Sequence, residues 1–430
     1  MGEIAYAKPQ IKFLSAPSAV PNSVRIAMPH HQKESILSES EFGHRPSVSI
    51  FFYTGDFAGA FLRFKDGREQ GYATHNEICL LVEALKELGF RCVLYSFITS
   101  EPFDLQIDNV RFVGIGAKSF DCPNLLRIAV ENDKSEILIP HFPNLELLCA
   151  VKKTGRRAMA FLASSYYHRS VLAPWRRYKL ARQLNHKNLE LVANHCRPST
   201  LHLAAFGVNR SKLIAWDVPH RYEPNSFVAK RRNADTLRLA YAGTVTKAKG
   251  VTDLIYAISI IGQHRPVSCS IAGSGDVEEM QSLANRLGVK DVHFLGQIAN
   301  DEVFAMYQQA DLAIVPSRRE FPEGFPLTMF EAIASRTPII CSDHPIFTAV
   351  LADGENAAIF KNGDPASLAR AILRVAEDVD IYAKLSDNAL MTWTSLNGTA
   401  DWKTLIIEWI TNGENSPWIQ DYKICNGKLL

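Results

Sequence analysis

The chain has 430 residues, more than one ordinary hydrophobic core supports, so two domains are expected. Its 47% hydrophobic and 21% charged residues are typical of a soluble globular protein, and its net charge of +2 indicates neither a strongly acidic nor a strongly basic partner. The eight cysteines form no C-x-x-C pair and no apolar run reaches about 18 residues, which argues against a zinc site, a disulfide framework and a transmembrane helix.

Residues 1–45 are expected to form a poorly ordered leader. They contain several prolines and many serines, follow no helix or strand period, and lack the apolar segment of a signal peptide. The cysteines of the chain are scattered, as in proteins of a reducing compartment. The sequence therefore predicts a cytoplasmic protein.

Residues 46–222 predict a first α/β domain. The expected opening strand, Ser47–Tyr53, is rich in β-branched and aromatic residues, and a loop containing several glycines and a helix near 74–89 follow it. Later strands are expected at 92–97, 137–140, 158–162 and 191–193. Strands that alternate with helices in this way predict a parallel sheet.

A basic stretch runs through residues 152–187. Between Glu146 and Glu190 there are ten Lys or Arg residues and no acidic residue, and Trp175 and Tyr178 lie among them. Aromatic and cationic side chains mixed in this way are typical of segments at an anionic membrane surface, although a solvated basic face gives the same pattern. No nucleic-acid-binding motif accompanies the charge, so no nucleic-acid partner is expected.

Residues 237–395 predict a second α/β domain, joined to the first by a linker at 223–236. Six short apolar runs alternate with helix-like stretches, at 237–242, 268–272, 292–295, 310–315, 338–341 and 357–360. Residues 396–430 are interpreted as a C-terminal helix and tail that pack back on the first domain. The predicted fold class is therefore α/β, with two doubly wound Rossmann-like domains that face each other across a cleft.

Loops that contain glycine follow the expected strands of the second domain. The loop from Gly243 to Gly250 opens a helix, so its backbone can approach a phosphate closely. Gly273 and Gly296 follow the next two strands, and each of these loops alone is a weak signal. Because ligands of parallel sheets bind beyond the carboxyl ends of the strands, the loops are expected to open into one crevice.

The strongest pattern is Glu323-Gly324-Phe325-Pro326 with Glu331 after it, which follows the apolar run 310–315. Pro326 suits the first turn of a helix, where no backbone N–H is needed. Free N–H groups at such a helix start attract an anion, and two carboxylates flank this one. A sugar nucleotide requires both features, since N–H groups bind its diphosphate and carboxylates bind its hydroxyls.

These motifs resemble those of the family 4 retaining glycosyltransferases of the GT-B fold, over most of residues 237–380. By this resemblance Glu323 is the acid beside the transferred sugar, and Glu331 accepts hydrogen bonds from the nucleotide ribose. The backbone of Gly324 and Phe325 is expected to face sugar and phosphate.

The resemblance also assigns donor contacts to the loops of the second domain. Lys249 is expected to bind the diphosphate. Thr244 stands where the family usually has an arginine, and Lys247 is a candidate substitute for that missing cation. Gly273 supports the phosphate site, and the backbone of Gln297 and Ile298 is expected to hold the nucleobase.

In the first domain, Gly71 and Tyr72 resemble the family's glycine loop near the donor phosphate and the acceptor. His141 lies at the end of an expected strand, where relatives often carry a histidine that contacts the sugar. A second histidine of this kind is not evident, because Ala163-Ser164-Ser165-Tyr166 follows the next expected strand.

The function implied is transfer of a hexosyl group from a nucleotide-diphosphate sugar to a glycan or lipid-linked acceptor, with retention of configuration, in glycan or polysaccharide synthesis. The nucleotide sugar is a co-substrate, and neither a metal ion nor a separate cofactor is expected. The enzyme is expected in the cytoplasm, with peripheral contact at the inner face of the cell membrane through 152–187. The alternatives are a nucleotide-sugar epimerase, a phosphorylase, or a catalytically silent protein that binds sugar nucleotides.

Overall fold

The structure is a computed structural model that describes residues 45–68, 73–119, 122–165, 173–232, 235–396 and 399–424. The chain divides into residues 1–45 and one compact unit, Pro46–Leu430. The expected leader lies outside the described residues except for Arg45, and so do Gly71 and Tyr72 of the expected acceptor-side loop.

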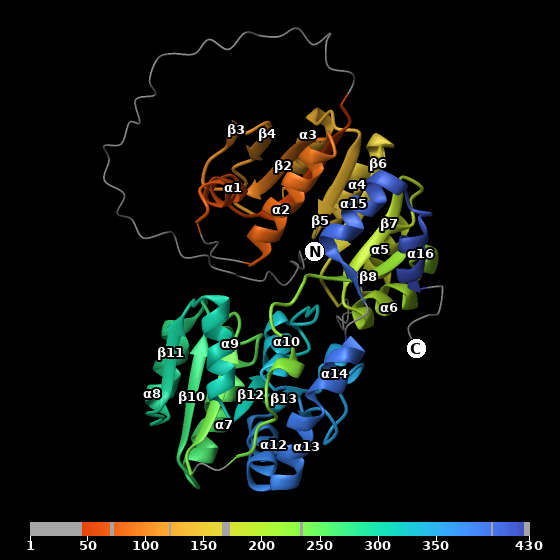
Figure 1. The fold of residues 1–430 in the computed structure, drawn as a ribbon. Helices are drawn as coiled ribbons and strands as arrows, with labels where there is room; N and C mark the ends of the chain where they lie inside the picture. The colour runs from red at the N-terminus through yellow and green to blue at the C-terminus, as the bar shows by residue number, and fades with distance from the viewer. Residues whose placement is uncertain are drawn as a thin grey trace, which may run out of the picture. The chain divides into compact units, whose positions relative to one another are not determined.

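The first half of the compact unit is built on a nine-stranded sheet with the strand order β15-β8-β7-β6-β5-β1-β2-β4-β3 (Figure 1). Every neighbouring pair is parallel except β3 with β4, which form an antiparallel edge. The strands are β1 Ser47–Thr54, β2 Arg91–Ile98, β3 Phe103–Ile107, β4 Val110–Gly114, β5 Ile137–His141, β6 Arg157–Leu162, β7 Leu189–His195, β8 Leu213–Asp217 and β15 Ala400–Asp401.

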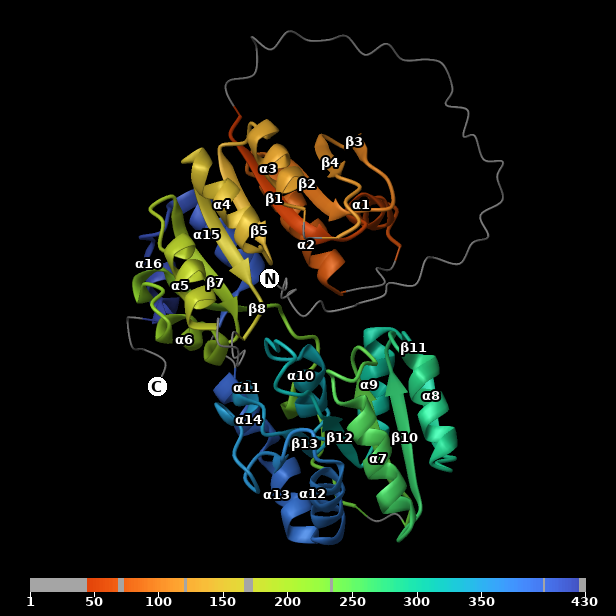
Figure 2. The same cartoon turned by 180° about the vertical axis from the view of Figure 1, so that it is seen from behind.

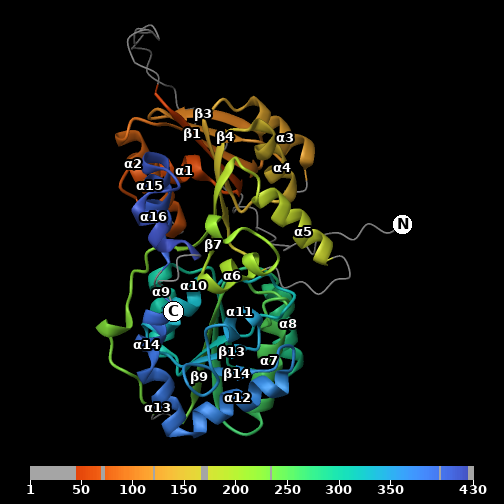
Figure 3. The same cartoon turned by 90° about the vertical axis from the view of Figure 1, so that its right-hand side faces the viewer.

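Helices cover both faces of this sheet, because its central strands are apolar on both sides. In β1, Val48 and Ile50 pack into one core and Phe51 into the other. Figure 3 shows α2 and α15 on one side of the strands and α3, α4 and α5 on the other. The helices are α1 Phe57–Lys65, α2 Ala73–Glu87, α3 Pro123–Asn132, α4 Leu145–Thr154, α5 Ala173–Leu184, α6 Arg197–Ala205, α15 Trp402–Asn412 and α16 Pro417–Tyr422, with a 3-10 turn η1 at Arg210–Lys212.

The second half has a six-stranded, fully parallel sheet with the order β11-β10-β9-β12-β13-β14 (Figure 2). Its strands are β9 Leu237–Ala242, β10 Val267–Ala272, β11 Val292–Gly296, β12 Leu312–Val315, β13 Ile339–Ser342 and β14 Ala358–Phe360. Its helices are α7 Val251–Gly262, α8 Val277–Arg286, α9 Asn300–Gln309, α10 Leu327–Ala334, α11 Pro345–Thr348, α12 Pro365–Glu377, α13 Val379–Asp387 and α14 Ala389–Leu396. Residues of α7, α8 and α12 build one core of this half, and residues of α9, α10 and α14 build the other.

The segment expected as a linker is anchored to the second half. After the 3-10 turn η2 at Pro224–Ser226, Nζ of Lys230 donates to the carbonyls of Tyr307 and Ala310 and to the hydroxyl of Thr337, each at 2.7 Å. Burial lowers the pKa of Lys230 to about 8. Three acceptors offset the cost of burying this ammonium group, so the segment has a fixed path here.

The C-terminal segment returns to the first sheet. Strand β15 pairs with β8, and Trp402, Leu405 and Ile406 of α15 join the core that contains Ile50. A residue near the end of the chain can therefore line a site in the first half.

The predicted α/β class with Rossmann-like parallel sheets is confirmed, and the six strands of the second sheet lie at the six apolar runs. In the first half, the β3–β4 hairpin, β8 and β15 were not predicted. These strands are only two to five residues long, too short for a period of two to stand out. Strand β8 matters most, because it carries Trp216 and Asp217.

Candidate functional site

The loops after β9, β10 and β11 are tied together through their backbones. The N–H of Gly243 donates to the carbonyl of Ala272 at 3.0 Å, and the N–H of Gly273 donates to the carbonyl of Gly296 at 2.7 Å. A Cβ atom on Gly273 would lie 1.8 Å from the carbonyl oxygen of Gly243, and its φ is +139°. Only glycine permits this approach, so close backbone contacts hold the ends of β9, β10 and β11 together.

The first of these loops places Lys249 against the residues that follow β12. Gly250 has φ +77°, and a Cβ there would lie 2.0 Å from the carbonyl oxygen of Pro316. Nζ of the neighbouring Lys249 lies 2.6 Å from Oε1 of Glu323, and 4.2 Å from the centre of the Phe321 ring. A glycine at position 250 therefore allows the contact between the two loops that carries this ion pair.

Glu323 is buried, with 3% of its surface exposed, in the loop of residues 316–326, named here the Glu323 loop. The hydroxyl of Ser317 donates to the same carboxylate oxygen that Lys249 contacts. Arg318 holds the loop from the other side through a bidentate ion pair with Asp253, at 2.6 and 2.8 Å. One oxygen of this buried carboxyl group therefore has both a cation and a hydroxyl donor as partners.

Residues of the first half contact the Glu323 loop directly. The N–H of Ser165 donates to the carbonyl of Glu323 at 2.8 Å, and the N–H of Phe325 donates to Nδ1 of His195 at 3.3 Å. A Cβ on Gly324 would lie 3.1 Å from the same Nδ1 and 3.2 Å from the carbonyl oxygen of Ala163. The strand ends of β6 and β7 therefore lie against the start of α10.

His195 belongs to a buried hydrogen-bonded network. Because its Nδ1 accepts from Phe325, its proton lies on Nε2, which donates to Oδ1 of Asp217 at 3.0 Å. Nε2 of His220 lies 3.2 Å from the other oxygen of Asp217, and its ring stacks on Phe330 of α10 at 4.0 Å. Burial acts to raise the pKa of Asp217, but the interactions with His195 and His220 outweigh it and hold the pKa below its usual range. We call these three residues the His195–Asp217–His220 network.

Glu331 lies on α10, and its carboxyl group is less exposed to solvent than that of an ordinary surface residue. Burial raises the pKa of Glu331 to about 7. Its Oε2 is buried and accepts no hydrogen bond from any residue that the structure describes. A buried acceptor without a described partner carries a desolvation cost in this structure.

His141 ends β5 inside a group of aromatic rings. Its ring centre lies 5.0 Å from Phe52, 4.1 Å from Phe142 and 5.8 Å from Trp402. Burial lowers the pKa of His141 to about 3, so the ring is neutral at pH 7. The residues after both strand-end histidines have left-handed backbones, with φ +53° at Phe142 and +59° at Cys196. Such conformations cost about 1–3 kcal/mol outside glycine and are concentrated at functional sites.

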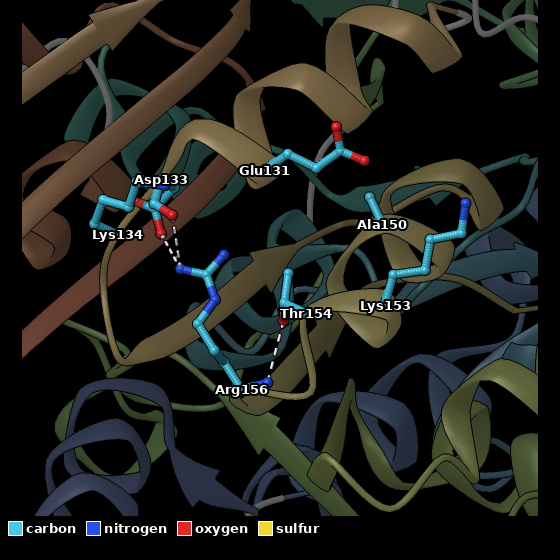
Figure 4. A pocket seen from close by; sticks show the side chains of 7 residues that line it. All are labelled: Glu131, Asp133, Lys134, Ala150, Lys153, Thr154 and Arg156. Carbon is cyan, nitrogen blue, oxygen red and sulfur yellow. Dashed lines mark hydrogen bonds and ion pairs between the residues drawn. The ribbon is translucent and has the colours of Figure 1, made fainter.

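A hollow lies at the amino ends of strands of the first sheet, and most of the residues that line it are charged. It has a volume of about 410 Å³ and lies where β5 and β6 begin, with Arg156 pointing toward Asp133 (Figure 4). Asp133 is held by Arg156 at 2.8 Å and by the hydroxyl of Ser49 at 2.6 Å. These charges are engaged in joining α3 to the sheet, and ligands of parallel sheets bind at the other edge. We therefore interpret the hollow as structural.

Within the described ranges, no three His, Cys, Asp or Glu side chains are gathered so that they could hold a metal ion. No helix in the described part of the chain has both the length and the apolar character needed to cross a bilayer.

Comparison with known proteins finds relatives of the second half. Residues 223–391 match the family described as Glycosyl transferases group 1. We call this matched region, residues 223–391, the group 1 domain. It shares 34% identity over 126 residues with phosphatidyl-myo-inositol mannosyltransferase of Mycobacterium leprae, which is 29% of this chain and 33% of that protein. The chain spans less than half the length of the curated glycosyltransferases that it matches.

Solved structures extend the likeness from the group 1 domain to both halves. Sucrose-phosphate synthase of Thermosynechococcus elongatus superposes with a TM-score of 0.62 at 18% identity, over 86% of this chain and 98% of that one. HepE of Anabaena, in complex with UDP and glucose, superposes with a TM-score of 0.58 at 16% identity, over 85% and 98%. At these identities the likeness establishes the fold, which is GT-B.

Within the group 1 domain, the structure brings Lys249, Glu323 and the Gly324–Phe325 backbone together. Thr244 lies in the same loop, and its carbonyl accepts a hydrogen bond from the hydroxyl of Tyr241 at 2.7 Å. The side chain of Lys247 is exposed, and Gln297 is exposed after β11 at the sheet edge, followed by the half-buried Ile298. The predicted roles of these residues in donor binding stay predictions.

Sequence reasoning missed the residues that reach the group 1 domain from the first half. A second strand-end histidine was sought after β6 and was not evident there, whereas His195 is the last residue of β7. The signal that could have found it is His195-Cys196-Arg197-Pro198, a polar residue at the end of the apolar run 191–193 and before a proline-opened helix. No comparable signal marks Asp217 or His220, since their role depends on the pairing of β8 with β7.

Proposed function

We propose that this protein transfers a hexosyl group from a nucleotide-diphosphate sugar to an acceptor, with retention of configuration and without a metal ion. The observation that carries the proposal is the buried Lys249–Glu323 pair in a group 1 domain, beside the N-terminus of α10. A carboxylate, an ammonium group and free helix N–H groups are the donors and acceptors that a sugar diphosphate requires.

In the proposed reaction, the diphosphate leaves the anomeric carbon with developing negative charge. Lys249 and the N–H groups at the start of α10 stabilise this charge, an electrostatic contribution that is often the largest in catalysis. Glu323 faces the transferred sugar and Glu331 accepts hydrogen bonds from the ribose. The departing phosphate oxygen takes the proton of the acceptor hydroxyl, so no separate general base is required.

A thermal-shift screen of UDP-glucose, GDP-mannose and ADP-glucose tests donor binding, since a true donor raises the unfolding temperature by mass action. A stabilising donor is then incubated with glycan and lipid-linked acceptors, and the anomeric configuration of the product is read by NMR, with and without EDTA. Stabilisation without transfer to any acceptor contradicts the proposal and favours a silent binding protein. Conversion of the nucleotide sugar without an acceptor favours an epimerase.

We further propose that the enzyme works in the cytoplasm and contacts an anionic membrane through α5 and its neighbours, where a lipid-linked acceptor is available. Trp175 and Tyr178 on α5 are 55% and 62% exposed, and Nζ of Lys179 lies 3.5 Å from the centre of the Trp175 ring. A groove of about 490 Å³ beside them is lined by the cations Arg127, Lys153, Lys179 and Arg182, together with one acid, Glu146. Exposed aromatic rings among cations suit the interface of anionic lipids.

Sedimentation with vesicles of phosphatidylglycerol and phosphatidylcholine tests this contact. Binding is expected at low salt, weaker at high salt, and largely lost in Lys179→Glu/Arg182→Glu. The matched control is Lys290→Glu/Lys361→Glu, which makes the same charge change at two exposed lysines of the group 1 domain. No binding at low salt, or an equal loss in the control, removes the proposal.

A further inference from the structure

The ammonium group of Lys249 has two partners in the Glu323 loop. Its Nζ lies 2.6 Å from Oε1 of Glu323 and 4.2 Å from the centre of the Phe321 ring, and only 14% of the lysine side chain is exposed. A cation over an aromatic ring is attracted by the electrons of the ring face, and this attraction is stronger where water is excluded. The carboxylate and the ring therefore restrict the position of the ammonium group together.

A lysine depends on such restraint more than an arginine does. Its ammonium group is a point charge at the end of four flexible carbons, and a single ion pair can be kept in several side-chain conformations. In the same loop, Thr244 carries no charge and the side chain of Lys247 is exposed. The binding of a diphosphate at these strand ends consequently depends on where Nζ of Lys249 lies.

The backbone of Phe321 is held by three hydrogen bonds. Its N–H donates to the carbonyl of Arg318 at 3.0 Å, and its carbonyl accepts from the N–H of Glu323 at 2.8 Å and from Nε2 of His344 at 3.1 Å. The first two bonds lie within the Glu323 loop, whereas the third comes from the segment that follows β13. His344 therefore ties the part of the loop that carries the ring to the sheet.

The beginning of the Glu323 loop has anchors of its own. The hydroxyl of Ser342 donates to the carbonyl of Ser317 at 2.6 Å, just after β12, and Arg318 forms the ion pair with Asp253. Both anchors lie before Phe321 in the chain. The bond from His344 is made at Phe321 itself, so it acts most directly on the ring.

His344 makes this bond in one tautomer only. The side chain is fully buried at the start of α11, and its Nδ1 accepts the N–H of Ile346 at 3.2 Å, so its proton lies on Nε2 and is donated to Phe321. Burial lowers the pKa of His344, so the ring is neutral at pH 7. The two ring nitrogens have separate roles, because Nδ1 caps the helix and Nε2 holds the loop.

We propose that Phe321 and His344 are positioning residues for Lys249. The ring of Phe321 confines Nζ of the lysine to the place where it meets the leaving diphosphate, and His344 holds the ring there through the carbonyl of Phe321. Neither side chain touches the donor, so both act through the lysine. That the lysine stabilises a leaving group rests on the proposed function, whereas its position over the ring does not.

The position of Lys249 is tested by NMR of the intact protein labelled with ¹³C-lysine. Protons above the face of an aromatic ring resonate upfield, so the Cε protons of Lys249 are expected upfield of those of the exposed Lys290. The signal is assigned by its absence in Lys249→Arg, which distinguishes it from that of Lys179, whose Nζ lies over Trp175. The upfield shift should be lost in Phe321→Leu and kept in Phe321→Tyr. No upfield shift in the unmodified protein, or an unchanged shift in Phe321→Leu, overturns the proposal.

Two substitutions of His344 separate the helix cap from the loop contact. An asparagine amide reaches about as far as Nδ1 and can accept the N–H of Ile346, whereas a glutamine amide reaches about as far as Nε2 and can donate to the carbonyl of Phe321. His344→Gln is therefore expected to keep the upfield signal and to lower the unfolding temperature. His344→Asn is expected to lose the signal with a smaller loss of stability. A signal kept in His344→Asn, or lost equally in both variants, overturns the positioning role of His344.

Turnover shows whether the position matters to the reaction. For whichever of UDP-glucose, GDP-mannose and ADP-glucose is turned over, we expect Phe321→Leu to lower kcat about tenfold and to leave KM within about threefold, because the restraint acts most on charge that develops in the transition state. Phe321→Tyr keeps a ring and should restore most of kcat. Phe294→Leu is the matched control, since it removes a half-buried ring on β11 that packs against the core of the α7 side. An equal kcat in Phe321→Leu and Phe294→Leu overturns the positioning of Lys249 as a catalytic effect.

The NMR signal and the turnover distinguish this proposal from the proposed function. A lysine signal that depends on Phe321, without turnover of any donor, retains the position of Lys249 and removes the assigned reaction. Turnover that persists when the signal is lost retains the reaction and overturns the role of Phe321 and His344 in it.

Discussion

The two halves of the compact unit place different chemical groups at the carboxyl ends of their strands. In the group 1 domain the site consists of glycine loops, a buried ion pair and a helix start, and its residues lie in loops that directly follow strands. In the first half, aromatic rings from distant segments, from Phe52 on β1 to Trp402 on α15, line a cavity. One half offers fixed charges and N–H groups, and the other offers shape and apolar surface.

The difference determines what each half can bind. A diphosphate always presents the same charges, so Lys249 and the backbone N–H groups of the strand-end loops can bind it whatever sugar is attached. An apolar cavity offers no fixed charge and recognises a ligand by shape, which requires side chains on several sides at once. The His195–Asp217–His220 network connects the two, because it belongs to the first half and holds the N–H of Phe325.

Loss of the Lys249–Glu323 pair is expected to have the largest effect. Lys249→Met leaves the Glu323 carboxylate buried with Ser317 as a donor and without its cation, which should lower the free energy of unfolding by about 3–5 kcal/mol. The proposed transfer rate should fall about 10²–10³-fold, since one preorganised donor to the leaving group is lost. Urea unfolding and donor turnover measure the two effects.

The double variant Lys249→Met/Glu323→Gln separates stability from chemistry. It buries no unpaired charge, so most of the lost stability should return while transfer stays low. Lys290→Met on the surface is the control and should change neither quantity. Normal turnover in the double variant would remove the ion pair from the proposed mechanism.

His141 should show how the apolar cavity of the first half responds to acid. Its pKa of about 3 lies below the 6.5 of the unfolded chain, so the unfolded state binds more protons between these pH values. The stability associated with neutral His141 is complete above pH 6.5 and falls by about 1.4 kcal/mol per unit as the pH drops toward 3. Near pH 4.5 the loss reaches about 2–3 kcal/mol. In His141→Asn this acid dependence should disappear, and in the exposed control His293→Asn it should remain, as read from unfolding midpoints at pH 4.5 and 7.5.

The site residues that the sequence could predict lie mainly in the group 1 domain, and those that it could not predict lie in the first half. Glu323 was singled out because strand-end loops carry local patterns, and Lys249 was assigned by the family resemblance. Parallel topology brings such loops to one edge. Trp216, Asp217 and Trp402 could not be found, because β8 and β15 are too short to show a period and their pairing is a tertiary event. The sequence shows no histidine directly after β6, and the structure brings His195, at the end of the neighbouring β7, against the Glu323 loop. The two sheets themselves were predictable from alternation alone.

Asp217→Asn should weaken the connection between the halves. The amide can donate to Nε2 of His195, which shifts the ring proton to Nδ1, so the ring no longer accepts the N–H of Phe325. We expect the Phe325 amide to exchange with deuterium faster, and kcat/KM for the donor to fall about 10–100-fold. Asp387→Asn, at an exposed pair with Arg231, is the control. Unchanged exchange and turnover in Asp217→Asn would show that the network only stabilises the first half.

Glu331 offers the smallest effect and a test in which stability and donor binding move in opposite directions. Its folded pKa of about 7 exceeds the 4.5 of the unfolded chain, so the folded state holds the proton more tightly. The destabilisation from ionised Glu331 is absent below pH 4.5, grows through the interval and is complete above pH 7. Because the group is partly solvated, we expect Glu331→Gln to add about 1–2 kcal/mol of stability at pH 8 and little at pH 4. Thermal unfolding at both pH values measures this change.

The same substitution should weaken nucleotide binding if Glu331 accepts the ribose hydroxyls, because an amide oxygen is a weaker acceptor than a carboxylate. Glu278→Gln, exposed on α8, is the matched control and should alter neither stability nor affinity. A stabilised Glu331→Gln that binds UDP as tightly as the unmodified protein would keep the burial argument and reject the ribose contact. A variant that is not stabilised at pH 8 would instead show that the carboxyl group is better solvated than its position on α10 indicates. The two measurements therefore test the electrostatics of the group 1 domain separately from its ligand.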